Sequence, residues 1–169
     1  MILTGTEIIK EIKKGNINIS PFNKNQINPN SYNYRLGNNL KIFKKFDGNK
    51  SIFEKIVIPE KGYCLKPKQM YLGHTYEIIG SKKYAMSLIG RSSMGRLGLF
   101  LQISANLGHT TSNHHWTLEM VALKPLIIYP EMIIGQVSFW TNMGTFNKYC
   151  GNYGKYNEPQ EFLEFKKIL

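Results

Sequence analysis

The feature that most constrains the fold of this chain is a succession of short runs of β-branched and aromatic residues, separated by turn-forming residues. From position 34 onward the runs recur about every ten residues, and no helical segments alternate with them. This spacing is typical of a β-sandwich or β-barrel, whereas a parallel sheet would need intervening helices. The predicted strands are Leu40–Phe43, Ile52–Ile58, Met70–Ile79, Tyr84–Ile89, Leu99–Ala105, Trp116–Leu123, Leu126–Tyr129 and Ile133–Trp140.

One helix is predicted, at the N-terminus. Thr4 and Glu7 have the spacing of a capping box, three isoleucines that follow form one apolar stripe, and Gly15 stands where a helix commonly ends. Proline and asparagine then predict an irregular connection. The chain is therefore expected to be a single domain of 169 residues, with its helix in 1–15, an irregular connection in 20–33, a β-barrel in 34–145 and a closing C-terminal segment in 150–169.

The bulk composition excludes several protein classes. A hydrophobic content of 42% suits a globular protein, and no apolar stretch approaches the roughly 20 residues that cross a bilayer. The N-terminus also lacks the apolar core of a signal peptide. Cys64 and Cys150 have no metal-binding spacing, so we expect reduced thiols in a cytoplasmic protein.

The formal net charge of +11 suggests an anionic partner without naming it. Nucleic acid, a nucleotide polyphosphate and a membrane surface all fit such a charge. The chain is also rich in Lys, Ile and Asn together, as AT-biased coding produces, so pairs such as Lys44–Lys45 and Lys82–Lys83 fit a solvated surface slightly better. Charge alone decides nothing about function.

The segment Gly90–Gly98 combines two arginines, two adjacent hydroxyls and three glycines between predicted strands. Glycines let backbone N–H groups approach an anion, hydroxyls add short donors, and guanidinium groups match phosphate oxygens. The alternative is a turn with surface arginines. Because so many anion donors coincide, a phosphate-binding loop is favoured, although the segment lacks the ending of a P-loop.

Glu119 lies in the predicted strand Trp116–Leu123. Alternation places Trp116, Leu118, Met120 and Ala122 on one face and Glu119 on the other. A lone strand carboxylate is usually exposed to solvent, and the alternative is a functional cavity, because burying it unpaired is costly.

Three histidines, His109, His114 and His115, lie within seven residues and raise the hypothesis of a zinc site. No Cys, Asp or Glu lies nearby in the sequence as a further ligand, and neighbours on a strand point to opposite faces. Histidines of a loop or an interface are the favoured interpretation.

The order of these motifs along the chain resembles the dCTP deaminase family. The resemblance extends over essentially the whole chain, and the combination of the Gly90–Gly98 segment with Leu118–Glu119 at this distance is specific. The segments that carry it are Met1–Leu3, Ile19–Phe22, Ser31–Gly37, Gly90–Gly98, Thr117–Glu119, Tyr129–Gln136 and Gly154–Tyr156.

The resemblance implies an all-β, dUTPase-like distorted β-barrel (β-clip) that assembles as a homotrimer, or as a hexamer of two trimers, with sites at subunit interfaces. It implies zinc-independent deamination of dCTP to dUTP and ammonia, with Mg²⁺ on the substrate phosphates and no metal bound by the chain. Membranes are not expected as partners, and nucleic acid is not favoured.

The resemblance also assigns roles to residues. Glu119 matches the essential glutamate, and one carboxylate can shuttle every proton of the reaction if a dry pocket favours its protonated form. Ser92 and Arg96 are expected to hold the water or to fix the glutamate, as further catalytic residues. The predicted substrate-binding residues are Arg91, Ser92, Ser93, Arg96, Ala105, His109, Gln136, Lys155, Tyr156 and Gln160.

The segment Gly108–Ser112 departs from the family pattern I-D-P-G-[FW], because His109 replaces the aspartate. Asn33 replaces an aspartate near the N-terminus, and the tail motif is longer by one residue between Tyr156 and Gln160. The departures predict altered sugar recognition and no diphosphohydrolase activity. Two alternatives remain: a dUTPase-like pyrophosphatase, and a non-catalytic nucleotide-binding relative.

Overall fold

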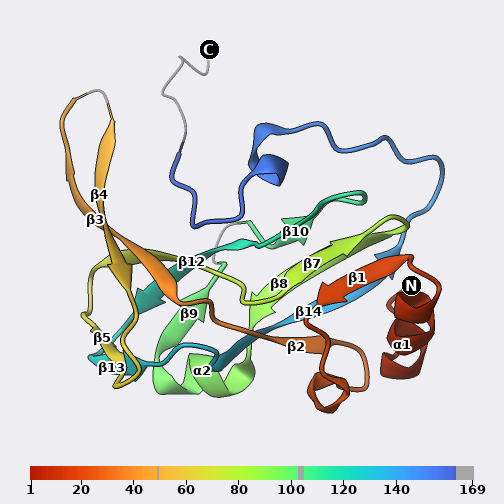
Figure 1. Cartoon of the computed structure of the whole chain (residues 1–169), viewed down its shortest axis with the longest axis horizontal. Helices are drawn as coiled ribbons and strands as arrows, with labels where there is room; N and C mark the ends of the chain where they lie inside the picture. The colour runs from red at the N-terminus through yellow and green to blue at the C-terminus, as the bar shows by residue number, and fades with distance from the viewer. Residues whose placement is uncertain (49, 103–104, 163–169) are drawn as a thin grey trace.

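The computed structural model describes residues 1–48, 50–102 and 105–162, which form mostly β-structure in four sheets (Figure 1). The all-β architecture predicted from the sequence is confirmed. The elements in chain order are α1 (Gly5–Lys13), β1 (Ile17–Ser20), η1 (Lys24–Gln26), β2 (Tyr32–Arg35), β3 (Asn39–Phe46), β4 (Ser51–Val57), β5 (Tyr63–Leu65), β6 (Met70–His74), β7 (Ile78–Ser81), β8 (Tyr84–Gly90), α2 (Ser92–Leu97), β9 (Leu99–Leu101), β10 (Leu107–Gly108), β11 (Asn113–His114), β12 (Thr117–Ala122), β13 (Leu126–Ile128), β14 (Ile133–Thr141) and η2 (Asn152–Lys155).

Two larger antiparallel sheets make up the body of the molecule. One has the strand order β4-β3-β6-β12-β9, and the other has the order β10-β8-β14-β2. Smaller sheets, β1-β7-β11 and β13-β5, complete the fold. A single hydrophobic cluster joins side chains from both larger sheets and from α1, so the five-stranded sheet has one face on the core and the other available for a site.

Helix α1 begins and ends where its sequence predicts. The Thr4 hydroxyl accepts a hydrogen bond from the backbone N–H of Glu7 (3.4 Å), which is the first half of a capping box. The Glu7 carboxylate contacts Lys10 (3.2 Å). Gly15 adopts φ +71°, a left-handed conformation that favours glycine just after a helix.

Glu11 is a buried carboxylate on the inner side of α1, and its side chain is only 2% exposed. It accepts hydrogen bonds from Lys14 (2.7 Å), Asn16 (2.8 Å) and the Tyr84 hydroxyl (2.8 Å). The bonds from Lys14 and Asn16 lower the pKa of Glu11 from 4.5 to about 2, against the opposing effect of burial. Ionised Glu11 therefore fastens α1 to β8.

Replacing Glu11 by glutamine is expected to lower the free energy of unfolding at pH 7 by about 2–3 kcal/mol. Because the folded pKa lies below the unfolded one, this stabilisation is complete above pH 4.5 and is lost as the pH falls towards 2. Urea unfolding of both proteins at neutral and at acidic pH measures the effect. A difference in stability that did not shrink in acid would contradict it.

The predicted strand Met70–Ile79 is wrong as a single element. Strand β6 ends at His74, and β7 begins only at Ile78. Between them the N–H of Thr75 donates to Trp116 O (2.9 Å), and that of Tyr76 donates to Arg35 O (2.8 Å). The chain changes hydrogen-bonding partners at this point and passes from the five-stranded to the three-stranded sheet.

The region from Gly90 to Ala105 also differs from the prediction. Helix α2 lies inside the segment expected to be a loop, and Gly98 at φ +88° ends it. Strand β9 ends at Leu101 because Gln102 adopts φ +50°, which is not a strand conformation. The predicted continuation over Ile103 and Ser104 lies outside the described residues.

Further short elements were not predicted. Strands β1, β2, β5, β10 and β11 each contain two to four residues, too few for a periodic pattern. Both cysteines are free thiols, as expected. In the part of the chain that is described, the helices are too short or too polar to span a membrane.

Candidate functional site

Glu119 lies on the outward face of the five-stranded sheet. Along β12 the buried residues are Leu118, Met120 and Ala122, while Glu119 is half-buried on the opposite face. The predicted alternation of this strand is therefore confirmed. Since the inner face belongs to the core, Glu119 belongs to a surface that another segment can cover.

The register of the sheet places two further side chains in one row with Glu119. Leu72 on β6 pairs directly with Glu119, and Lys41 on β3 pairs directly with Leu72. Residues that pair directly across antiparallel strands project to the same face. Strands lie about 4.8 Å apart, so the backbone of Lys41 is about 10 Å from that of Glu119.

Gln102 holds the backbone of Glu119 from the edge of the sheet. The Gln102 side-chain oxygen accepts from Glu119 N–H (2.9 Å), and Gln102 N–H donates to Glu119 O (3.1 Å). The Gln102 side-chain amide also donates to Ala105 O (3.3 Å). One amide thus connects β12 with the start of the Ala105–His109 region. Gln102 was not predicted as a site residue, because no local pattern marks it.

A cavity of about 670 Å³ opens over this face of the sheet. It brings together five of the residues that the resemblance assigned to the site: Glu119, Ala105, His109, Tyr156 and Gln160. These come from β12, from the loops on either side of β10 and from the C-terminal segment, which passes over the sheet (Figure 1). The cavity is therefore our candidate active site.

The chemistry of the cavity wall suits a flat, weakly polar ring. Aromatic side chains dominate its lining, and Glu119 and Glu161 are the two carboxylates among the described lining residues, which include no lysine or arginine. An aromatic base can stack here, whereas an anionic group finds no lysine or arginine among the described lining residues. Apart from the histidines, only Tyr156 among the aromatic lining residues was predicted as a site residue. The aromatic lining residues other than histidine are Phe43, Phe53, Trp116, Tyr149, Tyr153, Tyr156 and Phe162.

The C-terminal segment is docked along the cavity through residue 162. Tyr149 stacks on His109 with 5.1 Å between ring centroids, and its N–H donates to the Thr111 hydroxyl (2.9 Å). Farther along, Gln160 N–H donates to the Thr117 hydroxyl (3.0 Å). The backbone of Lys155 belongs to η2, and residues 163–169 lie outside the described part. Tyr156 and Gln160 of this segment line the cavity, and their predicted closing role stays a prediction.

His109, His114 and His115 all line the cavity. No group of three or more His, Cys, Asp or Glu side chains with the geometry of a metal site occurs among the described residues. Both His114 and His115 direct Nδ1 at backbone carbonyls, those of His115 (2.8 Å) and Thr75 (2.9 Å). Burial lowers the pKa of His114, so its ring favours the neutral form.

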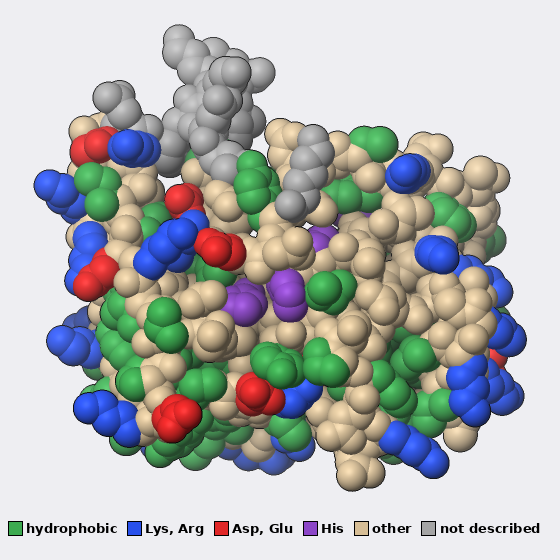
Figure 2. All heavy atoms as spheres, in the orientation of Figure 1, with side chains coloured by type: hydrophobic (Ala, Val, Ile, Leu, Met, Phe, Trp, Pro, Cys, Tyr) green, Lys and Arg blue, Asp and Glu red, His purple; other side chains and the backbone are tan. Residues whose placement is uncertain are grey.

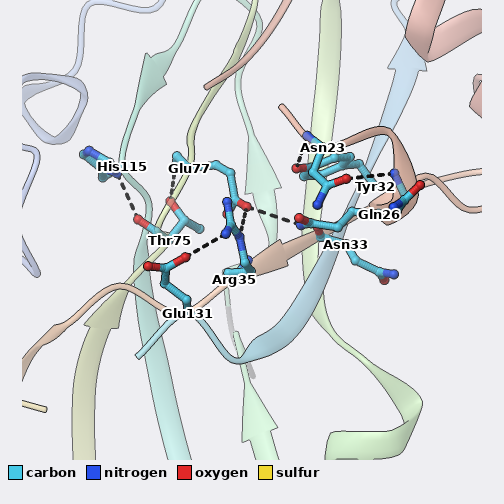
Figure 3. A network of polar contacts seen from close by, with 10 residues as sticks. Asn23, Gln26, Tyr32, Asn33, Arg35, Thr75, Glu77, His115 and Glu131 are labelled. Atoms are coloured by element: carbon cyan, nitrogen blue, oxygen red, sulfur yellow. Dashed lines mark hydrogen bonds and ion pairs between the residues drawn. The ribbon is translucent and has the colours of Figure 1, made fainter. Parts of the chain in front are cut away.

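Figure 3 shows the network that supports His115. The Thr75 hydroxyl donates to Glu77 O (2.7 Å), and the fully buried Glu77 carboxylate accepts from Arg35 Nε (2.8 Å). Arg35 Nη1 donates to the Glu131 carboxylate (2.8 Å). The network reaches the cavity through Thr75, whose backbone oxygen contacts Nδ1 of His115 (2.9 Å).

His74 lies in edge contact with His115 at 5.5 Å. Its Nδ1 points at Thr75 O (3.0 Å), and its Nε2 accepts from Asn39 N–H (3.4 Å). Burial lowers the pKa of His74. The two contacts fit one neutral tautomer, with the proton on Nδ1.

The predicted anion-binding residues lie elsewhere in the chain. Arg91, Ser92, Ser93 and Arg96 precede or belong to α2, and none of them lines the cavity. Figure 1 places α2 and the C-terminal segment on opposite sides of the sheets. Ser92 and Arg96 are therefore not among the described residues that share this cavity with Glu119.

Gln136 is also outside the cavity. It lies on β14, where its side-chain oxygen accepts from the Ser31 hydroxyl (2.9 Å). The residues assigned by resemblance thus fall into a cavity group around Glu119, a cationic group at α2, and Gln136 beside β2.

Comparison with known proteins decides the family. A family model described as dCTP deaminase-like matches residues 2–142. A protein of Clostridium botulinum (strain Eklund 17B / Type B) that is named "dCTP deaminase, dUMP-forming" is 43% identical over 170 residues, which cover 98% of each chain. The chain belongs to the dCTP deaminase-like family.

Other members of this family are similarly close. The protein of the same name from Clostridium acetobutylicum is 41% identical over 173 residues, covering 100% of this chain and 99% of its own. The fold resembles the crystal structure of 2′-deoxycytidine 5′-triphosphate deaminase from Agrobacterium tumefaciens, with a TM-score of 0.68 and 17% identity, over 86% of this chain and 50% of that chain. At this low identity the solved structure supports the fold alone.

Membership of the dCTP deaminase-like family confirms the resemblance inferred from the motifs. The matched residues 2–142 include Glu119 and Gly90–Gly98, the two most specific segments. They end before the docked part of the C-terminal segment, where the sequence already departs from the family pattern.

Proposed function

We propose that this protein deaminates dCTP hydrolytically and that Glu119 is its proton shuttle. The observation that carries the proposal is the position of Glu119, on the wall of an aromatic cavity, with its backbone held by Gln102. The relatives are named for the same reaction. Ammonia release from dCTP by the purified protein is the direct test, and it separates a deaminase from a pyrophosphatase and from a non-catalytic relative.

The proposed deamination needs one water molecule and one carboxylate. Glu119 accepts a proton from water as the water oxygen bonds to C4 of the cytosine, and it delivers that proton to N3. It then moves the second proton, from the new hydroxyl at C4, to the exocyclic nitrogen. The C4–N bond breaks, ammonia leaves, and the base becomes uracil. Closure by the C-terminal segment keeps other water away from the reacting carbon.

The product requires a correction of the prediction from sequence. That prediction was dUTP without diphosphate hydrolysis, whereas the relatives are named dUMP-forming. We therefore propose dUMP as the final product, with a second water attacking the α-phosphorus and pyrophosphate leaving. His109, which is exposed on the cavity wall, is the candidate base for this second water.

With dCTP as substrate, the wild-type protein is expected to give ammonia, dUMP and pyrophosphate in equal amounts. A His109→Ala protein is expected to keep releasing ammonia while dUTP accumulates, because only the second step loses its base. A His109→Asp protein, which restores a carboxylate, should still form dUMP. Chromatography of the nucleotides checks all three. Unchanged dUMP formation by His109→Ala would remove His109 from this role.

We further propose that the triphosphate is bound by a neighbouring subunit. The described lining of the cavity offers no lysine or arginine, whereas Arg96 is exposed on α2, outside the cavity that Glu119 lines. Apolar side chains exposed around α2, Leu97, Phe100 and Leu123, fit a surface that another subunit covers. A homotrimer, in which α2 of one subunit completes the cavity of the next, reconciles the two groups of residues.

Mg²⁺ is proposed only as a companion of the substrate phosphates. The described residues offer no cluster of three or more metal-ligating side chains, so phosphate oxygens and water would hold the ion. There it would neutralise part of the phosphate charge. No step of the proposed deamination depends on it.

A further inference from the structure

We infer that Lys41 and Lys55 are positioning residues that hold the C-terminal segment over the cavity through Glu161 and Glu158. The kinetic consequence of this inference rests on the proposed function. The contacts themselves are present in the structure whatever the activity of the protein. On the face shown in Figure 2, acidic and basic side chains meet beside the histidines.

The two ion pairs bracket a residue of the candidate site. Lys41 donates to Glu161, and Lys55 donates to Glu158 (3.1 Å). Between the two carboxylates, Gln160 N–H donates to the Thr117 hydroxyl (3.0 Å). The four-residue stretch Glu158–Glu161, which we call the strap, is thus tied to three strands, β4, β3 and β12.

Lys41 is the stronger of the two anchors because it is nearly buried. Its side chain is 9% exposed, and Glu161 is 33% exposed. A lysine at this depth is costly unless a carboxylate accompanies it. Lys55 and Glu158 are both well exposed, so salt screens their attraction much more.

The position of Lys41 in the sheet links the strap to the reacting residue. Lys41 lies in the same row as Leu72 and Glu119, on the face that the cavity covers. Glu161 and Gln160 line that cavity, and Gln160 is bonded to Thr117, two residues from Glu119. Binding of the strap to Lys41 therefore also fixes the position of Gln160 in the cavity lining.

The carboxyl groups of the strap respond to their lysines. The hydrogen bond from Lys55 lowers the pKa of Glu158. For Glu161 burial acts to raise the pKa, but the hydrogen bond from Lys41 and other contacts outweigh it, so the pKa is lowered overall. Both carboxylates are thus ionised at neutral pH, as the two ion pairs require.

Hydrogen exchange on the full, ligand-free protein tests the strap directly. Lys41→Gln and Glu161→Gln are each expected to speed amide exchange in residues 157–162 about tenfold, because the segment loses its buried anchor. The reversed pair, Lys41→Glu with Glu161→Lys, should regain most of the protection. The control Glu54→Gln removes the Lys44–Glu54 pair on the same two strands, away from the strap, and should change nothing.

Steady-state kinetics with dCTP test the consequence for the site. Lys41→Gln and Glu161→Gln are each expected to raise KM about tenfold and to change kcat by less than about threefold, since binding requires the closed strap. The reversed pair should recover most of the loss. A fall in KM for Glu161→Gln would overturn the inference, because it would mean that Glu161 competes with the substrate for Lys41.

The two experiments separate the strap from the proposed function. If the wild-type protein released no ammonia from dCTP, hydrogen exchange would still decide whether Lys41 anchors the segment. Exchange rates in residues 157–162 that were the same in wild type, Lys41→Gln and Glu161→Gln would refute the strap even if the protein were an active deaminase.

Discussion

Replacing Glu119 by glutamine is expected to reduce ammonia release from dCTP by at least about a thousandfold. Glutamine has the same shape and still lets Gln102 hold the backbone, but it cannot accept a proton from water. Because the proton shuttle acts on the reacting atoms, kcat should fall while KM changes little. An ammonia assay over a range of dCTP concentrations measures both constants.

The matched control for this variant is Glu60→Gln, which removes a carboxylate from an exposed turn. It should retain wild-type rates. A Glu119→Gln protein that deaminated dCTP at near wild-type rate would refute the assigned role, provided that thermal unfolding of the two proteins agrees. If the variant lost kcat because it unfolds, its melting curve would show a lower melting temperature than that of the wild type.

Local patterns predicted the elements whose cause is local. The ends of α1 could be predicted because Thr4 and Gly15 act on the backbone within one turn of the helix. The two faces of β12 could be predicted from alternation alone. The cavity-facing position of Glu119 needed the family resemblance, since alternation by itself favours a solvent-exposed carboxylate.

Other features depend on contacts between distant parts of the chain. Strand β6 ends because Thr75 meets Trp116 and Tyr76 meets Arg35, which no window around residue 75 shows. The role of Gln102 depends on a left-handed backbone and a partner on β12. Helix α2 contains Gly95, which lowers helix propensity, so the sequence favoured a loop.

The sequence could not show which of the predicted site residues lie close together in one chain. Motif order placed Arg96 and Glu119 in one site, whereas the described lining of the cavity around Glu119 includes no residue of α2. Motifs record what a site contains and do not record which chain supplies each residue. The absence of Arg96 from the described lining therefore predicts that two subunits contribute to each site.

Mixing two inactive variants is expected to restore deamination. Arg96→Gln should lower the rate of ammonia release about a hundredfold or more by removing a charged contact to the phosphates. Glu119→Gln removes the proton shuttle. In a ring of subunits refolded from equal amounts of both chains, about a quarter of the sites combine an intact Glu119 with an intact Arg96 from the neighbour. The mixture should therefore show about a quarter of the wild-type rate.

This outcome depends on where each residue comes from, and so it distinguishes the two possible sites. If Arg96 and Glu119 of one chain acted together, every site in the mixture would carry one defect and no activity would return. A mixture of Glu119→Gln with Glu119→Ala is the matched control, because two defects in the same cavity cannot complement. Size-exclusion chromatography should show wild type and mixture at about three times the chain mass of 19.5 kDa. Complementation without that assembly, or assembly without complementation, would contradict the shared site. The described lining of the cavity has no lysine or arginine, so the shared site requires a neighbouring subunit that supplies Arg96.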